Sequence, residues 1–531
     1  MKNIDLMLIS SPANAIDKFM PFSSLYLAGY LEKFGFKISI VNPHFKFIED
    51  NNNFIIEEVK KQNPKYIGFS CFVTDYDVVS DLAEKVRKVS NAKILAGNAQ
   101  PSVAPEDFLY EGSPFDIVVR GEGELTVKEI LSSKQDIDTL YKIDGIAFFD
   151  KNHVGSDGIK GSIVINKNRT LINMADCGKP AYHLIDVNWY TAPTKYVIRR
   201  LTAVCAVIYT GRGCPYKCNF CASNVVWNTN SKGGKGATFV RWRSLDVVME
   251  ELALLQNKYG FDFFYILDDT FGVNEKQTIA FCEAYKASGL KMLWAAETRV
   301  TCIKNPEIVK LLRESGCIQL DFGVESGSPR LLKSIKKLTT VEDTYRAFKL
   351  CRQYGMRTFC NMLLNMRGET EEDLELSKKM LADIKPTFTS IGGVQPYPGT
   401  DLYKSLGFKI NKRDYHLLDR IYPKEKFRLA SHKLDLKELI FGWYLKYKIY
   451  APFQKGFFTA GFDYWKKIIL SKHRFKYFKY MLRVILGMPI YYFQVRFDHY
   501  SDKLKKVRLK KGEEMHSEKA RLKDEEIHSG L

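Results

Sequence analysis

The sequence predicts an α/β protein made of two consecutive sets of alternating strands and helices, followed by a helical, basic region. Short apolar runs of strand length alternate with segments whose apolar residues recur at helical spacing, first over residues 1–150 and again over residues 201–400. Polar residues or glycines follow several of the apolar runs, as at Gly121–Glu124 and Asp268-Asp269. Repeated strand–helix units of this kind indicate parallel sheets.

The first set, residues 1–150, predicts a Rossmann-like, doubly wound sheet. Strands are expected at 4–9, 37–41, 66–70, 93–96 and 117–120, and helices at 23–33, 53–61 and 77–89. No GxGxxG motif follows the first strand, which argues against a dinucleotide ligand. Ligands of such sheets bind outside the carboxyl ends of the strands, where this chain carries Thr74, Gly97, Gly121 and Glu122.

The second set, residues 201–400, predicts a TIM-type parallel βα barrel or a partial barrel. Strands are expected at 263–267, 292–296, 318–324, 357–365 and 389–395, with helices at 244–259, 278–287, 305–315, 341–354 and 371–384. Barrel chemistry takes place at the carboxyl ends of the strands. The candidate residues there are Asp268, Asp269, Glu297, Arg299, Glu325 and Ser326. The alternative is that the acidic residues only cap the helices that follow.

Three of the eleven cysteines, Cys214, Cys218 and Cys221, lie on one loop with the spacing CxxxCxxC. Three thiolates hold a cubane iron–sulfur cluster and leave one iron open, whereas a structural zinc site needs four ligands. The other cysteines are scattered singly, and Cys205 is the nearest candidate for a fourth ligand. No apolar leader precedes the first strand, so we expect a reducing, cytoplasmic compartment without disulfides.

The cysteine loop resembles the signature of radical S-adenosylmethionine (SAM) enzymes, including its Gly213-Cys214-Pro215 start and its aromatic Phe220, and the resemblance continues to Thr400. It implies a 4Fe-4S cluster bound by the three cysteines. It also implies that SAM contacts a set of strand-end and loop residues, namely Phe220, Asp268, Asp269, Glu297, Arg299, Glu325 and Ser326.

The N-terminal part resembles the cobalamin-binding domain that precedes many radical SAM barrels. Residues 25–35, the Thr74 loop and residues 116–124 carry the resemblance. It implies cobalamin contacts at Thr74, Gly97, Gly121 and Glu122. The DxHxxG motif of other cobalamin domains is absent, and Asn98 stands where a second glycine is usual. The alternative is a flavodoxin-like scaffold that has lost its cofactor.

The resemblance implies cleavage of SAM to a 5′-deoxyadenosyl radical, and we expect cobalamin-dependent methylation of an unactivated carbon. A cyclisation, rearrangement or oxidation of a tetrapyrrole-like or lipid-like substrate is the first alternative. A non-catalytic corrin and iron–sulfur sensor is the second. We assign no catalytic residue from the sequence. The partners implied are a small-molecule substrate and an electron donor such as flavodoxin or ferredoxin.

Residues 151–200 predict a linker with a small strand pair, and residues 401–531 a helical, basic and aromatic region. Between Trp465 and Lys511 the sequence contains fourteen Lys and Arg residues but only two Asp residues, and the whole chain has a net charge of +19. Interleaved basic and aromatic residues are typical of a helix that binds a membrane surface. The alternative is a solvated helix whose aromatic side chains pack on the barrel. The longest apolar stretch, 484–493, is shorter than the ~20 residues of a spanning helix. No nucleic-acid motif occurs, and residues beyond Leu509 predict a frayed tail.

Overall fold

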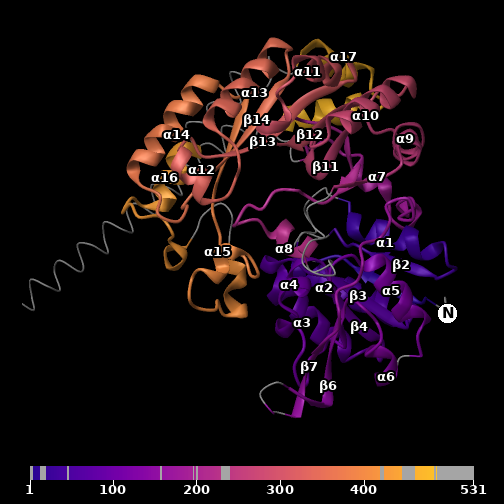
Figure 1. Ribbon diagram of the computed structural model, residues 1–531. Helices are drawn as coiled ribbons and strands as arrows, with labels where there is room; N and C mark the ends of the chain where they lie inside the picture. The colour runs from indigo at the N-terminus through magenta and orange to yellow at the C-terminus, as the bar shows by residue number, and fades with distance from the viewer. Residues whose placement is uncertain are drawn as a thin grey trace, which may run out of the picture. The chain divides into compact units, whose positions relative to one another are not determined.

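Two large sheets and a two-stranded ribbon organise the chain in the computed structural model (Figure 1). By contact density, Met1–Ser471 forms one unit and Lys472–Leu531 a second. The structure describes residues 4–11, 20–44, 47–134, 136–155, 158, 160–194, 197–198, 201–228, 240–418, 424–444, 461–483 and 486. The predicted tail beyond Leu509 therefore lies outside the described residues.

The N-terminal sheet has the strand order β2-β1-β3-β4-β5-β6-β7, and its first five strands are parallel. These strands are β1 (Leu6–Ile9), β2 (Ile38–Val41), β3 (Tyr66–Ser70), β4 (Lys93–Gly97) and β5 (Ile117–Val119). This order confirms the predicted doubly wound sheet. The strand order reverses at β1 and β3, which is where such sheets bind their ligands.

The alternation of apolar residues along β1 explains the two helical layers of this domain. Met7 and Ile9 belong to a core with α2 (Ile48–Gln62) and α3 (Tyr76–Arg87), whereas Leu6 and Leu8 belong to a core with α1 (Phe22–Glu32) and α5 (Gly123–Ser132). Successive side chains of a strand point to opposite faces, so a continuous apolar run needs cover on both. A short helix, α4 (Ala99–Val103), follows β4.

The sheet extends beyond the predicted domain boundary at residue 150. Two further strands, β6 (Ile146–Val154) and β7 (Lys160–Ile165), pair antiparallel to β5 and to each other. The boundary therefore falls inside β6, and the strand expected within the linker is the edge strand of this sheet.

The second sheet has six parallel strands in the order β15-β14-β13-β12-β11-β8. Its edges, β8 and β15, do not pair with each other, so the predicted partial barrel is confirmed. The strands are β8 (Cys205–Ile208), β11 (Phe263–Phe271), β12 (Leu293–Thr298), β13 (Cys317–Glu325), β14 (Arg357–Leu364) and β15 (Phe388–Gly393). The helices between β11 and β15 are α10 (Glu275–Ala287), α11 (Pro306–Glu314), α12 (Pro329–Ser334), α13 (Val341–Gln353) and α14 (Glu371–Ile384).

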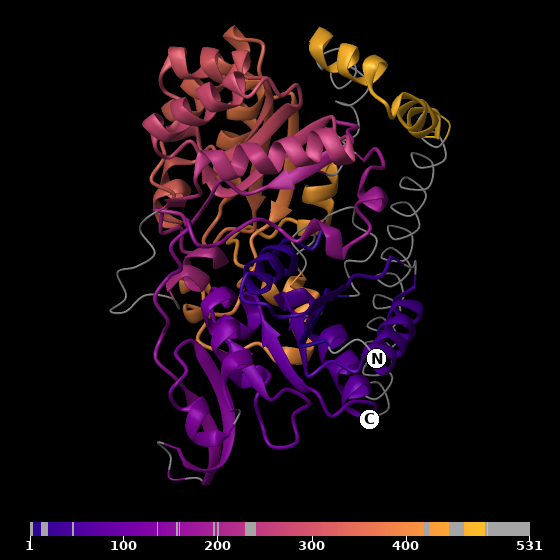
Figure 2. The ribbon, with the colours of Figure 1, turned by 90° about the vertical axis from the view of Figure 1, so that its right-hand side faces the viewer.

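After β15 the chain returns to the N-terminal domain (Figures 1 and 2). Ile410, Tyr415, Leu418 and Phe427 are buried in the same core as α2 and α3. Helices α15 (Asp401–Lys404), α16 (Leu436–Tyr444) and α17 (Gly461–Leu470) confirm the helical character predicted for this region. The N-terminal core is thus completed by residues from far along the chain.

A buried polar group at the carboxyl end of β14 holds this returning segment. Asn365 Nδ2 donates to the Phe427 carbonyl at 3.0 Å, and its Oδ1 accepts from the Leu429 backbone N–H at 2.7 Å. Glu369 Oε2 accepts from the Asn365 backbone N–H at 2.8 Å and lies 3.4 Å from His432 Nε2. Burial raises the pKa of Glu369 to about 8 and lowers that of His432.

We expect this raised pKa to make the wild-type protein lose stability as pH rises from about 4.5 to about 8, by up to about 1.4 kcal/mol per pH unit. In that range the folded state keeps a proton on Glu369 that the unfolded chain has lost. His432 acts in the opposite direction only below pH 6.5. Glu369→Gln keeps the acceptor for Asn365 but does not ionise, so its melting temperature should not fall between about pH 7 and 8. Equal falls in both proteins, measured by scanning calorimetry, would contradict the raised pKa.

Candidate functional site

The three predicted cluster ligands follow the ribbon strand β9 (Gly211–Arg212) and precede α8 (Ala222–Asn228). All three are free thiols, with Cys218 buried and the other two partly exposed. Burial raises the pKa of Cys221, and the nearby thiols of Cys218 and Cys214 raise it further. No group of three or more His, Cys, Asp or Glu side chains within the described ranges is arranged as a formed metal site. Cluster binding by these cysteines therefore stays a prediction, which the donor set supports.

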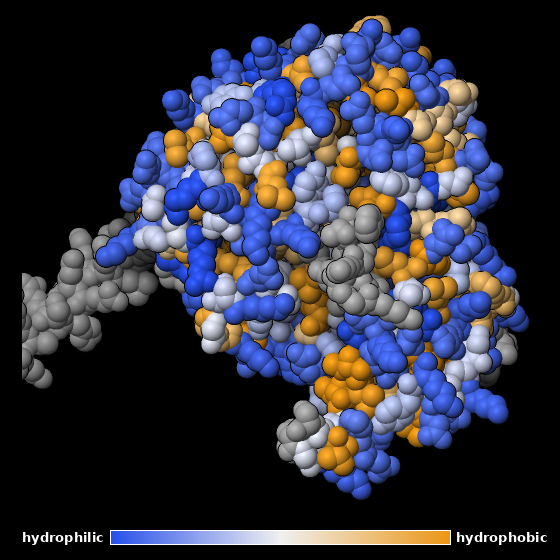
Figure 3. Space-filling model, viewed as in Figure 1, coloured by the Kyte–Doolittle hydropathy of each residue, from blue (hydrophilic) through white to orange (hydrophobic). Residues whose placement is uncertain are grey.

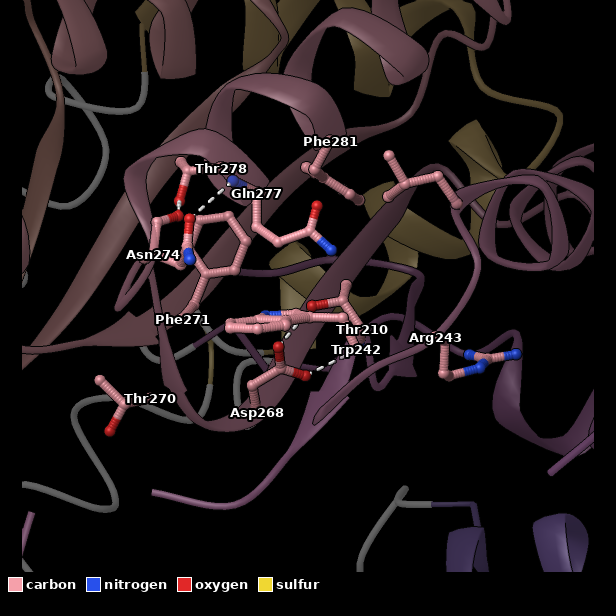
Figure 4. A pocket seen from close by; sticks show the side chains of 12 residues that line it. Thr210, Trp242, Arg243, Asp268, Thr270, Phe271, Asn274, Gln277, Thr278 and Phe281 are labelled. Carbon is pink, nitrogen blue, oxygen red and sulfur yellow. Dashed lines mark hydrogen bonds between the residues drawn. The ribbon is translucent and has the colours of Figure 1, made fainter. Parts of the chain in front are cut away.

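Asp268 and Asp269 support the backbone that leads into the cysteine loop; Figure 4 shows Asp268 beside Thr210. Strand β11 pairs regularly only as far as Ile266, just before the two aspartates. Asp268 accepts hydrogen bonds from the backbone N–H groups of Thr210 (2.7 Å) and Gly211 (3.1 Å), and also from the Thr210 hydroxyl. Asp269 Oδ2 accepts from the backbone N–H of Gly213 at 3.0 Å.

Burial also affects the charge of Asp268. It raises the pKa of this carboxyl to about 6, and the hydrogen bonds from Thr210 and Gly211 oppose that rise. A carboxylate that already accepts three hydrogen bonds has its main acceptor directions in use. The two aspartates thus have a definite structural role, and their contact with SAM stays a prediction.

Arg299, just beyond β12, connects three parts of the site. Its guanidinium lies over the Tyr216 ring, 3.6 Å from the centroid, and Nη1 donates to Cys218 Sγ at 3.7 Å. Nη2 donates to the Lys337 carbonyl. Nε is buried and has no hydrogen-bond partner among the described residues, so it can serve a ligand. Glu297 lies two residues earlier on β12 and is half-buried.

Backbone strain concentrates around Glu325, at the end of β13. Glu325 is a buried non-glycine residue with φ of 71°, and Lys336 and Leu338 both have φ of 54°. Lys337 Nζ donates to Glu325 Oε1 at 2.5 Å, and both side chains are buried. Strained backbone of this kind occurs often at ligand sites, because the surrounding structure must hold it in place. Lys337 was missed by the sequence analysis, since its partner is brought to it only by the loop after α12.

The predicted helix cap after β13 is present, but another residue provides it. Ser328 is the N-cap of α12 and accepts from the Leu331 backbone N–H at 3.3 Å. Ser326 is buried, accepts from the Ser328 backbone N–H at 3.1 Å and lies 3.3 Å from the Ser377 hydroxyl. A SAM contact of the Ser326 side chain stays a prediction.

Phe220 borders a cavity of about 150 Å³ beside the cysteine loop. Phe220 also packs against a small buried cluster that includes Ile335, Met366 and Val394, which line the same cavity. The cavity is thus partly apolar, and Asn219 and Asp401 contribute polar groups to its lining. This arrangement supports the prediction that Phe220 contacts SAM.

At the ligand-binding edge of the N-terminal sheet, two features fit a bound group. Ser10 Oγ, at the end of β1, is buried and has no hydrogen-bond partner among the described residues. A Cβ added to Gly97 would come no closer than 3.9 Å to its neighbours, so protein packing does not require this glycine. Both lie at the carboxyl edge of the sheet, next to the switch point, where an extended cofactor would bind.

The other residues predicted at this edge have varied surroundings. Asn98 has φ of 84°, and its side chain donates to Ser70 Oγ at 2.9 Å and accepts from the Ala99 backbone N–H at 2.7 Å. Thr74 is exposed, and the Gly121 backbone N–H donates to Ser102 Oγ at 2.9 Å. Glu122 forms ion pairs with two arginines of the second domain, so its cobalamin contact stays a prediction.

Several residues around the cysteine loop escaped the sequence analysis. Thr270 Oγ1 lies 3.4 Å from Cys214 Sγ, and Tyr216 supports Arg299. Arg212 and Arg241 lie opposite each other in the ribbon of β9 and β10 (Arg241–Trp242). Only the position of Arg212, two residues before Cys214, could have drawn attention to it.

Hydrophilic side chains predominate on the face seen in Figure 3, with apolar ones in small groups between them. Within the described ranges, none of the helices combines the length and the apolar composition that crossing a bilayer requires.

Two separate parts of the chain match models of known protein families. Residues 208–381 match the model of the radical SAM superfamily, and residues 14–131 match the model of the B12 binding domain. The match to the first model contains Cys214, Cys218 and Cys221, and the match to the second contains strands β2 to β5, among them the switch-point strand β3.

Among curated proteins, the chain is 29% identical over 406 residues to an uncharacterized methyltransferase of Pyrococcus horikoshii, covering 74% of this chain and 82% of the relative. It is 26% identical to an anaerobic magnesium-protoporphyrin IX monomethyl ester cyclase of Cereibacter sphaeroides, covering 77% and 64%. It is 23% identical to a hopanoid C-3 methylase of Methylococcus capsulatus, covering 70% and 66%.

Two solved structures share the fold. The radical SAM methyltransferase TsrM of Kitasatospora setae, solved with cobalamin and a [4Fe-4S] cluster, aligns with a TM-score of 0.57 at 18% identity, over 75% of this chain and 77% of that one. The cobalamin-dependent radical SAM enzyme OxsB aligns with a TM-score of 0.58 at 17% identity, over 84% and 61%.

Proposed function

Because the chain belongs to the radical SAM superfamily and carries a B12 binding domain, we propose that it is a cobalamin-dependent methyltransferase acting on a carbon atom of a small organic substrate. The observation that carries this proposal is the position of the cysteine loop. It lies at the carboxyl end of the barrel strands and against the ligand-binding edge of the N-terminal domain, so two cofactors would share one reaction space.

Cys214, Cys218 and Cys221 would hold the 4Fe-4S cluster. Bound there, the cluster would supply the one electron that cleaves SAM to methionine and a 5′-deoxyadenosyl radical. Arg299 places a positive charge beside Cys218, and its Nε, which has no hydrogen-bond partner among the described residues, would donate to an anionic group of SAM. The Glu325–Lys337 pair keeps two charges oriented at the same edge. The cavity beside Phe220 would exclude water from the apolar part of SAM.

For the second cofactor, the edge formed by Ser10, Gly97 and Gly121 offers small residues and a free hydroxyl. Bound cobalamin would supply a transferable methyl group, and the substrate carbon radical would accept it. The residues of this chain then have to orient two ligands and keep them dry, which is the usual contribution of a protein to cofactor chemistry.

The test is anaerobic reconstitution of the full chain with iron, sulfide and hydroxocobalamin, followed by dithionite and SAM. We expect 5′-deoxyadenosine, a corrin that co-elutes with the protein, and transfer of a deuterated methyl group from labelled SAM to the corrin. If the cluster is intact by spectroscopy but no 5′-deoxyadenosine forms, the proposal that the protein is an enzyme is wrong. The alternative of a non-catalytic sensor then stands.

A cyclisation or oxidation is the second candidate. The cyclase relatives and Asn98 in place of the usual second glycine favour it, because the Asn side chain occupies space at the cofactor edge. SAM cleavage by a protein whose corrin elutes freely would select this candidate over methyl transfer.

We propose that flavodoxin or ferredoxin supplies the electron that cleaves SAM. We also propose that the C-terminal unit contacts an anionic membrane surface. The helix over residues 474–483 exposes Phe475, Phe478 and Leu482 at helical spacing, and Leu486 continues the series. Five Lys and Arg residues and no acidic residue occur from 472 to 483. An apolar helical stripe beside cationic side chains is typical of interfacial binding.

Co-sedimentation with vesicles tests this surface. We expect the full chain to bind vesicles of anionic phospholipid and not vesicles of zwitterionic lipid alone, and we expect Phe475→Ser together with Phe478→Ser to reduce binding about 10-fold or more. Phe408→Ser, at an exposed phenylalanine of the first unit, is the matched control. If the wild type, the double variant and the control bind the vesicles equally, the proposal is wrong.

A further inference from the structure

A cluster of four charged side chains joins the cysteine loop to the N-terminal domain. Arg212 Nη1 lies 3.2 Å from Glu122 Oε1, and Arg212 Nη2 lies 2.7 Å from Glu124 Oε1. Arg241 binds Glu122 through both terminal nitrogens, at 2.7 and 3.1 Å. Both carboxylates are buried, and the arginine side chains are less than one-fifth exposed.

The backbone around this cluster makes it a direct link between two ligand sites. Arg212 ends strand β9, and Cys214 is only two residues further along. Glu122 follows Gly121 at the end of β5, at the ligand-binding edge of the N-terminal sheet. Arg241 Nη1 also donates to the Ile172 carbonyl at 2.7 Å, and the Ile172 backbone N–H donates to Glu122 Oε2 at 3.0 Å.

The other flank of the cysteine loop is held by the same domain. Helix α8 begins directly after Cys221 and lies against α4, which begins directly after Asn98 (Figure 1). Gly399 is part of this junction. A Cβ at Gly399 would lie 2.8 Å from Val225 of α8 and 3.1 Å from Val103 of α4, and φ there is 82°. The junction is therefore closely packed at Gly399.

We propose that Arg212 and Arg241, through Glu122 and Glu124, are positioning residues that fix the cysteine loop relative to the corrin edge of the N-terminal domain. This inference rests on the proposed function, because the four charged side chains would fix the distance between the two cofactors that this function requires. Bidentate arginine–carboxylate pairs suit such a role, since they fix orientation as well as distance. The cluster is too buried for solvent to substitute for a lost partner.

The experiment compares the full-length wild type with Arg212→Met and Glu122→Gln. Arg169→Met is the matched control, because Arg169 pairs with Glu129 in the same domain and does not contact the cysteine loop. The first readout is hydrogen–deuterium exchange of the apo protein over residues 209–221. We expect local opening to rise about 10-fold or more in both variants and not in the control, as for the loss of one charge-assisted hydrogen bond.

The second readout is electron paramagnetic resonance of the reconstituted, dithionite-reduced protein without SAM. Close approach of the reduced cluster speeds the relaxation of cob(II)alamin. We expect its half-saturation power to drop about twofold or more in both variants, at equal cluster and corrin content, because the loop loses its fixed position. A role in stability alone would lower the melting temperature and leave this coupling unchanged.

The outcomes separate the two proposals. If hydrogen–deuterium exchange over residues 209–221 is unchanged in Arg212→Met and Glu122→Gln, the positioning role is wrong, whether or not the protein binds corrin. A wild type that takes up no corrin overturns methyl transfer, and the exchange readout still decides the positioning role. If Arg212→Met does not fold, Arg241→Lys replaces it, since lysine keeps the charge but loses the two-pronged contact.

Discussion

For Cys218→Ala in the reconstituted protein, we expect the yield of 5′-deoxyadenosine to fall more than about 100-fold, beyond the loss usual for residues outside the first coordination sphere. Cys218 is the buried member of the three cysteines and the one that Arg299 contacts. If the three cysteines bind the cluster as we propose, the variant would leave it with two protein ligands. Iron content, visible absorption and 5′-deoxyadenosine are measured on the same sample.

Cys205→Ala is the matched control for this prediction. Cys205 is the nearest cysteine outside the motif, but it lies in β8, and its thiol donates to the carbonyl of Ala206 at 3.2 Å. We expect it to keep the cluster and the rate of SAM cleavage. Full activity in Cys218→Ala, or loss of the cluster in Cys205→Ala, would reassign the ligands.

Arg299→Met gives the second large effect, a loss of about 10- to 100-fold in SAM cleavage. The variant removes the charge beside Cys218 Sγ, the contact with the Tyr216 ring and the hydrogen bond to the Lys337 carbonyl. Because a nearby positive charge and hydrogen bonds to sulfur stabilise the reduced cluster, its reduction potential should also fall. A potentiometric titration followed by electron paramagnetic resonance measures that shift.

Arg299→Lys tests whether charge alone is enough. Lysine keeps the positive charge but loses the planar guanidinium that lies over Tyr216 and reaches two acceptors. We expect the potential to stay near that of the wild type while SAM cleavage stays reduced. A variant Arg299→Met with unchanged potential and rate would show that Arg299 acts only in packing.

The regular elements of both sheets could be predicted from the sequence because local signals mark their ends. The helix expected at 371–384 matches α14 to the residue, since Thr370 and Asp373 form a capping box at its start. The strand expected at 66–70 matches β3 in the same way, as an apolar run between polar residues. In β11, the regular pairing ends just before the predicted aspartates, which explains why these residues reach the site.

The site itself was predicted only where residues are close in sequence. The cysteine motif and the strand-end acids could be located, but their partners could not. Lys337 meets Glu325 only through the loop after α12, and Arg212 meets Glu124 across 88 residues. The ribbon strands β9 and β10 have two residues each, too short for any periodic pattern. Contacts of this kind depend on the folded topology, which local propensity does not specify.

The return of the chain after β15 restricts how the protein can be divided. Ile410, Tyr415 and Phe427 supply part of the core beneath α2 and α3, so a fragment that stops at residue 150 would expose apolar surface that the whole chain buries. Recombination that replaced only the first 150 residues would separate interlocking surfaces. We therefore expect the N-terminal domain to fold only together with residues 401–427, and an exchange of this domain with that of a relative would need to include both segments.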